Sequence, residues 1–348
     1  MNDIRELFGI ALPIVQAPMA GVQGSAMTIA VSNAGGLGSL PCAMLTPDTL
    51  RNELQAIASG TDRPWNVNFF CHAPPAPDAS REARWRVALA PYYAEFGLDP
   101  ASVATGAGRA PFAPEIADFL EAFRPPVVSF HFGLPAPALL ARVKGWGTKV
   151  ISSATTVAEA RWLEAHGVDA VIAQGLEAGG HRGIFLSADL GTQIGTMALL
   201  PQVVQAVRVP VIAAGGIADA NGVAAAMALG AAGVQVGTSY MLCPEATTTA
   251  LHRAALKSVR TEHTVLTNLI TGRPARGMLN RLMKDLGPLS EAPPEFPLAT
   301  AALVPLKAAA EALGRDDFST LWSGQNASGC REVPAAELTR ALAAGFAR

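Results

Sequence analysis

Short apolar runs and longer helical patterns alternate along most of the chain. The runs are rich in β-branched residues and end in glycine or polar residues, which is typical of strands buried in a parallel sheet. We predict eight strands, at residues 14–16, 37–40, 65–70, 127–130, 149–152, 170–173, 211–213 and 233–236. Helical patterns fall between most of them, at residues 26–33, 47–58, 135–144, 156–166, 196–207 and 220–229. This alternation predicts an α/β fold, a (β/α)8 barrel rather than an open doubly wound sheet.

Two of these strands, at 211–213 and 233–236, end in glycine-rich turns. Strands joined through one helix run parallel, so Gly215-Gly216 and Gly237-Thr238 should leave the same edge of the sheet. Glycines there allow backbone N–H groups to approach an anion, and the loops after strands seven and eight are the usual phosphate seat of such barrels. The two turns therefore predict one phosphate site.

Two segments do not fit the alternation. Residues 71–126 are too long for one crossover, and we expect an excursion with helices at 80–96 and 114–123. Residues 244–313 separate strand eight from the last helix. We predict that they form a helical lid or substrate domain inserted into a barrel made of residues 1–243 and 314–348. Its helices are expected at 247–259, 278–286 and 299–313, and the last barrel helix at 334–348.

Composition narrows the class of protein. The formal net charge of −2 gives no electrostatic reason to expect a nucleic-acid partner. The four cysteines show no CxxC spacing, so we expect neither a metal site nor a disulfide framework. The amino terminus has no apolar signal core, and no run reaches the ~20 apolar residues of a membrane helix. We expect a soluble cytoplasmic protein without a membrane partner.

Two histidines follow predicted strands at the carboxyl edge of the barrel. His181 lies in the glycine-rich loop 175–183 after Gln174, and His131 follows strand four. A neutral imidazole can take a proton near pH 7 or polarise a substrate, so both are catalytic candidates. The alternative for His181 is a solvent-facing loop residue. The remaining histidines are assigned surface or structural roles: His72, His166, His252 and His263.

Other candidate residues stand at the ends of strands one and three. Ala17, Pro18 and Met19 could border a flat ring, or could form an ordinary turn. Asn68 could present its amide to a ligand, or could tie down a loop. The glycines at 35–39 and 106–108 do not have the spacing of a dinucleotide-binding fingerprint.

Motifs spread from residue 13 to about residue 326 resemble one family. QAPMAG, GGLGS, NVNFF, SFHFG, EAGGHRG, AAGGI, QVGT, ITGRPARG and LWSGQ occur in the order typical of bacterial nitronate monooxygenase, formerly called 2-nitropropane dioxygenase. The resemblance implies an FMN-dependent barrel that oxidises alkyl nitronates, such as propionate 3-nitronate, with O2 to a carbonyl compound and nitrite. The FMN-binding residues it implies are Ala17, Pro18, Met19, Asn68, Gln174, Gly179, Gly180, Gly215, Gly216, Gln235, Val236, Gly237, Thr238 and Gln325.

The resemblance also implies roles at the substrate. A nitronate has already lost its α-proton, so His181 and His131 would hold its negative oxygens by hydrogen bonds or charge. Lys307 matches a basic position of the family and could complement a substrate carboxylate, or could be a solvated helix lysine. Related enzymes place tyrosines around the substrate, whereas the predicted lid has none and carries Phe296. The sequence therefore leaves the physiological nitronate, the oligomeric state and any lid motion open.

Three other functions remain possible on this barrel. A flavin-dependent enoyl-ACP reductase or NADH:quinone reductase would share the GGH loop and use NAD(P)H as electron donor. A phosphosugar isomerase or aldolase would use the phosphate seat without flavin, but would need a lysine or glutamate at a strand mouth. Lys149 begins strand five, at the opposite edge. A flavin-binding protein without turnover is the third.

Overall fold

A barrel of eight parallel strands forms the centre of the protein, in a computed structural model that describes residues 3–76, 78–102 and 109–347. The glycines at 106–108 considered above lie outside these ranges. The strands follow the order β1-β9-β8-β6-β5-β4-β3-β2, which confirms the predicted barrel. They are β1 (Ile14–Gln16), β2 (Gly38–Pro41), β3 (Trp65–Phe70), β4 (Val127–His131), β5 (Lys149–Ala154), β6 (Ala170–Gln174), β8 (Val211–Ala214) and β9 (Gly233–Val236).

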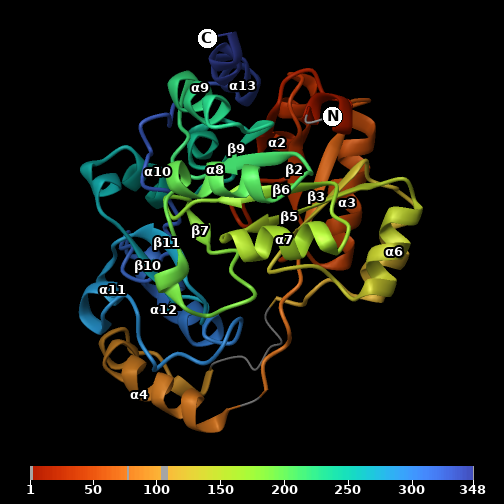
Figure 1. Cartoon of the computed structure of the whole chain (residues 1–348). Helices are drawn as coiled ribbons and strands as arrows, with labels where there is room; N and C mark the ends of the chain where they lie inside the picture. Colours follow the sequence, from red (N-terminus) through yellow and green to blue (C-terminus); the bar gives the residue numbers. More distant parts are fainter. Residues whose placement is uncertain (1–2, 77, 103–108, 348) are drawn as a thin grey trace.

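Helices cover the outside of the barrel (Figure 1). They are α2 (Ser25–Asn33), α3 (Pro47–Gly60), α5 (Pro114–Leu120), α6 (Pro137–Gly145), α7 (Val157–Ala165), α8 (Thr196–Ala206), α9 (Ala220–Ala228) and α13 (Ala335–Ala343). The short helix α1 (Ile4–Phe8) closes the amino-terminal end, where Ile4 and Phe8 pack against Val15 and other inner side chains. The predicted last helix is shorter than expected, because α13 ends at Ala343 and a 3₁₀ turn follows it.

The first and second strands meet at a short contact that nearly closes the barrel. Val15 and Leu37 form a parallel bridge, and β2 begins at Gly38, one residue later than predicted. A Cβ atom on Gly38 would lie 2.0 Å from the Thr28 carbonyl oxygen of α2. The glycine therefore allows this helix to pack closely against the strand, which explains why a glycine stands in a buried strand.

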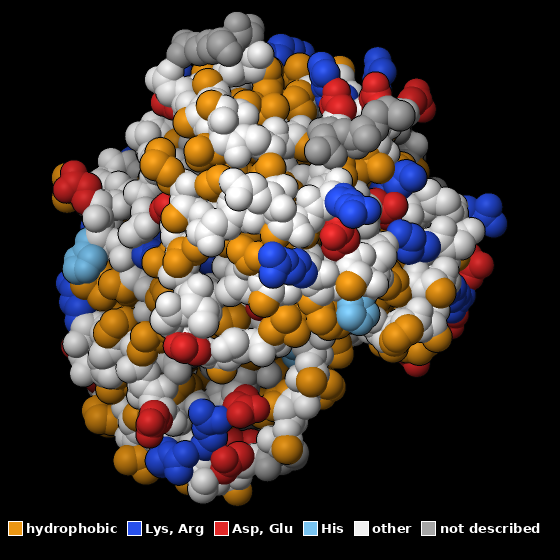
Figure 2. Space-filling view, in the orientation of Figure 1, with side chains coloured by type: hydrophobic (Ala, Val, Ile, Leu, Met, Phe, Trp, Pro, Cys, Tyr) orange, Lys and Arg blue, Asp and Glu red, His pale blue; other side chains and the backbone are white. Residues whose placement is uncertain are grey.

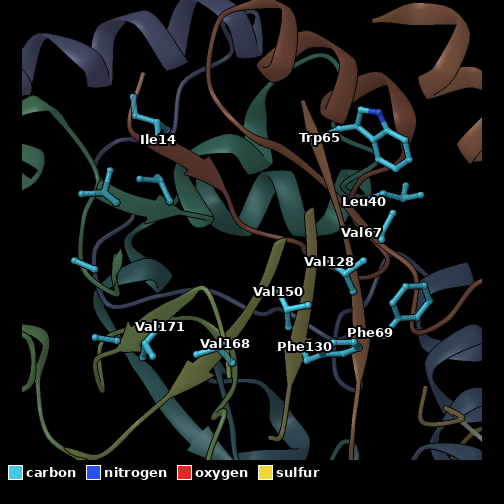
Figure 3. Close-up of a cluster of buried hydrophobic side chains, with 14 of the residues drawn as sticks. Ile14, Leu40, Trp65, Val67, Phe69, Val128, Phe130, Val150, Val168 and Val171 are labelled. Carbon is cyan, nitrogen blue, oxygen red and sulfur yellow. The ribbon is translucent and has the colours of Figure 1, made fainter. Parts of the chain in front are cut away.

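Side chains alternate between the outside and the inside of the barrel. On the outside, Val67 pairs in register with Val128, and Phe69 pairs with Phe130 (Figure 3). These side chains belong to the apolar core that packs against the surrounding helices. Inward positions near the carboxyl ends are polar instead and line a cavity. They include Asn68, Ser129, His131, Ser153, Gln174 and Gln235.

A second hydrophobic cluster combines two distant parts of the chain. Helix α4 (Ala79–Glu95), from the excursion after β3, packs beside α12 (Thr300–Ala312), and Figure 1 shows both near α11 (Arg281–Leu286). The Trp85 indole N–H donates to the Ala299 carbonyl at 3.1 Å. The excursion therefore contributes to the same packed unit as residues 244–313, a link that sequence analysis did not predict.

Residues 244–313 are not entirely helical, contrary to the prediction. Besides α10 (Ala250–Leu256), they contain β10 (Thr264–Thr267) and β11 (Ala275–Met278), which form an antiparallel pair. β11 also pairs with the two-residue strand β7 (Gly180–His181). The helix predicted from 278 begins only at Arg281, because the Asn280 side chain caps it there. This small sheet joins the inserted segment to His181.

Acidic and basic side chains are mixed on the face in Figure 2. Ion pairs also connect α4 to later segments of the chain. Arg281 lies 2.7 Å from the Glu95 carboxylate and 3.3 Å from that of Asp317, and Arg315 lies 3.0 Å from Glu95. Across the described ranges, no helix has both the length and the apolar composition to cross a bilayer.

Candidate active site

A cavity of about 280 Å³ opens at the carboxyl end of the barrel strands. It brings together nearly all of the residues selected from the sequence. Those that line it are Ala17, Pro18, Met19, Asn68, His131, Gln174, Gly179, Gly180, His181, Gly215, Gly216, Gln235, Gly237, Thr238 and Lys307. The two glycine turns and the two imidazoles thus face one cavity.

Two selected residues do not line it. Val236 is 1% exposed and belongs to the apolar core outside the barrel, because it alternates with the inward-facing Gln235. Gln325 is exposed, and its backbone N–H donates to the Glu177 carbonyl at 2.9 Å. Its neighbours Gly324 and Asn326 line the cavity instead.

One end of the cavity is made of glycine backbone. Gly215 and Gly216 have φ angles of 116° and 73°, which other residues adopt only under strain. The Asn326 amide donates to the Gly216 carbonyl at 3.0 Å, and the Gly324 N–H donates to the Thr238 hydroxyl at 3.0 Å. The turns after β8 and β9 are therefore held together by a third loop, which comes from residues 319–326.

The loop after β6 is fixed by a buried arginine. Arg182 is fully buried and donates to the carbonyl oxygens of Gln174 and Gly175 at 2.8 and 2.7 Å. The Gln174 amide in turn donates to the His181 carbonyl at 3.0 Å and accepts from the Gly183 N–H at 2.8 Å. The two Arg182 bonds are charge-assisted, and together with the Gln174 bonds they hold the loop in one conformation.

Both ring nitrogens of His131 have protein partners. Its Nε2 donates to the His181 carbonyl at 3.2 Å, which leaves Nδ1 to accept from the Ser153 hydroxyl at 3.0 Å. His131 therefore orients the backbone of His181. The resemblance had implied that His131 holds a substrate oxygen. In this arrangement neither of its ring nitrogens is free to do so.

The inserted segment, residues 244–313, holds the His181 side chain through a hydrogen bond. Its Nε2 lies 2.9 Å from the Thr271 hydroxyl oxygen, and that hydroxyl donates to the Arg273 carbonyl at 3.3 Å. In this arrangement the Nε2–H of His181 donates to Thr271, and Nδ1 keeps a lone pair. Four aromatic rings surround the imidazole at centroid distances of 5.3 to 6.1 Å: Phe70, Phe132, Phe296 and Trp322.

The imidazoles around the cavity are neutral at physiological pH. Burial lowers the pKa of His131 to about 3. Burial also lowers the pKa of His181 well below its ordinary value, and the positive charge of Arg109 adds to this effect. His72 lies beside Phe296, and burial likewise lowers its pKa to about 4. Any positive charge in the cavity must therefore come from lysine or arginine.

Sequence analysis missed several residues of the cavity. His252, assigned to a surface or structural role, is 3% exposed and lines the cavity, where its Nε2 donates to the Trp322 carbonyl at 3.0 Å. Arg109 lines it as well, and Thr271 supports it from behind. The sequence did offer one signal for His252, because it is the third residue of a helix, α10, that the Thr249 side chain caps. Arg109 offered none, because no predicted element places it.

One buried polar atom points to a bound group. The side-chain oxygen of Gln235 is buried without a hydrogen-bond partner in the described residues, although Gln235 lines the cavity. Buried acceptors without partners are uncommon, because leaving one unpaired costs about 1–3 kcal/mol. An N–H donor of a ligand in the cavity would satisfy it.

Comparisons with known proteins agree with this architecture. A sequence model of the family described as nitronate monooxygenase matches residues 2–345. Nitronate monooxygenase of Pseudomonas aeruginosa is 44% identical over 345 residues, covering 98% of both chains. That of Paraburkholderia phytofirmans is 43% identical over 339 residues, covering 97% of this chain and 92% of its own.

Two solved structures extend the likeness to the whole fold. Nitroalkane oxidase from Streptomyces ansochromogenes superposes with a TM-score of 0.89 at 39% identity, covering 99% of this chain and 97% of its own. FabK from Thermotoga maritima superposes with a TM-score of 0.73 at 28% identity, covering 99% and 95%. The chain belongs to the nitronate monooxygenase family of oxidoreductases.

Proposed function

We propose that this enzyme binds FMN at the mouth of the barrel and oxidises alkyl nitronates of the propionate 3-nitronate type with O2, giving a carbonyl compound and nitrite. The observation that carries the proposal is the cavity itself, in which the glycine turns after β8 and β9 face the same space as His181. Family membership supports nitronate oxidation in general. The cofactor, the oxidant and the products are our inference.

The residues present suit FMN. The backbone of Gly215, Gly216, Gly237 and Thr238 would bind one phosphate, which favours a mononucleotide over FAD or NAD. The unpaired oxygen of Gln235 suits an N–H group of the flavin ring. The remaining ring contacts would come from Ala17, Pro18, Met19, Asn68, Gln174, Gly179 and Gly180. Gln325, next to Gly324, would support the phosphate end through its backbone.

The flavin, when bound, supplies the redox chemistry between the nitronate and O2. The protein supplies position and proton transfer. Gln174, His131 and Thr271 fix the His181 ring and its backbone, and the lone pair on Nδ1 makes His181 a proton acceptor. His181 could therefore take the α-proton of a neutral nitroalkane, which would convert it into the nitronate in the cavity.

The inserted segment would act as the lid over this site. Residues 244–313 contribute Thr249, His252 and Lys307 to the lining, and Thr271 to the support of His181. The Lys307 ammonium lies 3.9 Å from the Glu311 carboxylate, so part of its charge is already balanced. To contact a substrate carboxylate, Lys307 would have to exchange this contact with Glu311 for one with the substrate.

Anaerobic mixing tests the proposal. The purified protein is mixed separately with propionate 3-nitronate and with NADH, flavin absorbance is followed, and nitrite is assayed after air is admitted. We expect rapid bleaching by the nitronate, slow or absent bleaching by NADH, and nitrite in air. Bleaching by NADH but not by the nitronate would replace the proposal with a flavin reductase. A colourless protein that gains no flavin on reconstitution would exclude flavin chemistry altogether.

A further inference from the structure

Arg109 is a cationic residue of the cavity for which neither the sequence nor the family comparison supplies a role. Its guanidinium carbon lies 5.8 Å from the centre of the Phe296 ring, and the His181 ring lies 5.3 Å from the same centre. Arg109 and His181 therefore share one wall of the cavity. The effect of the Arg109 charge on the His181 pKa is consistent with this closeness.

The charge of Arg109 has no carboxylate to balance it. None of the ion pairs among the described residues includes Arg109, and its guanidinium instead contacts the Met44 sulfur at 3.6 Å. The residues outside the described ranges contain no Asp or Glu, so no acidic side chain of the chain is left out of this comparison. Burial also lowers the Arg109 pKa, which means that the protein itself does not stabilise the charged form. Arg109 is half-buried, and a cation that has lost part of its hydration is destabilised unless a ligand supplies the counter-charge.

The other polar groups that line the cavity are less suited than Arg109 to supply positive charge to an anion. His131 has partners at both ring nitrogens, and the free Nδ1 of His181 presents a lone pair, which repels a negative oxygen. Lys307 lies 3.9 Å from Glu311, whereas Arg109 has no such partner. Among the described residues that line the cavity, Arg109 is therefore the strongest candidate to bind an anion.

We propose that Arg109 binds the nitronate group of the substrate. A nitronate is planar and carries its negative charge on two oxygens bound to one nitrogen, so it has the shape of a carboxylate. The guanidinium group presents parallel N–H donors with matching geometry. This contact would select the anion over the neutral nitroalkane and would hold it on the wall that His181 shares. The inference rests on the proposed function, because it assumes that the substrate is a nitronate.

Calorimetric titration of the FMN-loaded protein, carried out without O2 so that turnover cannot proceed, tests this. Sodium nitrate serves as an unreactive planar anion, and 1-nitropropane serves as a neutral molecule with the same nitro group. We expect Arg109→Gln to weaken nitrate binding about ten- to a hundredfold, as for the loss of a hydrogen bond to a charged group, and to change 1-nitropropane binding less than about twofold. Arg109→Lys should recover part of the affinity, because lysine keeps the positive charge but lacks the parallel N–H donors of the guanidinium.

The control variant is Arg86→Gln, which alters an exposed arginine of α4 and should change neither affinity. Unchanged nitrate binding in Arg109→Gln would overturn the inference. An equal loss for nitrate and 1-nitropropane would also overturn it, since that result means that Arg109 only maintains the shape of the cavity. If the wild-type enzyme makes no nitrite from a nitronate yet binds nitrate through Arg109, the proposed function fails and anion recognition by Arg109 stands.

Discussion

The two ends of the cavity are built in different ways. The end formed by the turns after β8 and β9 is mostly glycine backbone, and its elements follow one another along the chain. The other end consists of buried and half-buried side chains that come from separate segments. His181 follows β6, Arg109 comes from the excursion after β3, and Thr271 comes from the segment inserted after β9.

This difference separates what is needed for the cofactor from what is needed for the substrate. Backbone N–H groups at a barrel rim can bind a phosphate in many enzymes, whatever reaction those enzymes catalyse. The side-chain end has neutral imidazoles and one unpaired guanidinium, which is suited to a small anion. We therefore expect changes at the glycine end to affect FMN binding, and changes at the side-chain end to affect turnover.

Gly237→Val should give the largest effect. A Cβ atom at this position would lie 3.3 Å from the Ala17 Cβ and 3.4 Å from the Met19 sulfur, so a valine would fill the mouth of the cavity. The φ angle of −117° suits any residue, so the fold should persist. We expect FMN affinity to fall about a hundredfold, from an overpacking cost of up to about 3 kcal/mol, as measured by quenching of flavin fluorescence. Gly145→Val, where a Cβ meets open space, is the control and should bind FMN normally.

His181→Ala should retain FMN and lose most of its turnover of a neutral nitroalkane. Loss of the proton acceptor should lower kcat/KM for a neutral nitroalkane about a hundredfold, and should affect the nitronate less, because the nitronate needs no deprotonation. Steady-state oxygen consumption with both substrates measures this difference. His166→Ala changes an exposed imidazole on the outside of the barrel and serves as the control. Unaltered turnover in His181→Ala would remove His181 from the mechanism.

The side-chain end should also make stability depend on pH. Burial lowers the pKa of His252 to about 4, whereas in the unfolded chain it is about 6.5. As the pH falls from 6.5 towards 4, the unfolded chain takes up a proton that the folded protein excludes, so stability is lost. We expect wild-type protein to lose about 2 kcal/mol more than His252→Gln between pH 7 and pH 5. Urea denaturation at pH 7 and at pH 5 gives the stability that each protein loses. Equal losses of stability in wild type and His252→Gln would contradict the role of His252 burial.

Thr271→Val should have the smallest of these effects. The substitution removes the hydroxyl that lies 2.9 Å from His181 Nε2 and keeps the shape of the side chain. We expect kcat/KM to fall about three- to tenfold, since a typical hydrogen bond contributes about 1 kcal/mol, while FMN affinity stays constant. Thr267→Val removes a buried hydroxyl that accepts from the Leu269 N–H, and should leave kcat/KM unchanged. Equal kinetic losses in both variants would mean that Thr271 acts through general stability.

The same contrast explains how far the sequence could be interpreted. The barrel and the glycine turns were predicted because they depend on local patterns, namely apolar runs and glycines at the ends of adjacent strands. Arg109 and His252 were missed because the packing of distant segments, rather than local spacing, brings them to the cavity. The pairing of β11 with β7 was missed for a similar reason, since Arg276 and Gly277 give β11 no apolar alternation.

A titration of the flavin-free protein with FMN, FAD and riboflavin tests the central claim most directly. That claim is that the glycine turns bind the phosphate of a mononucleotide. It predicts one FMN per chain and affinities for riboflavin at least about a hundredfold weaker, because riboflavin lacks the phosphate. Equal binding of riboflavin and FMN, or a preference for FAD, would contradict it.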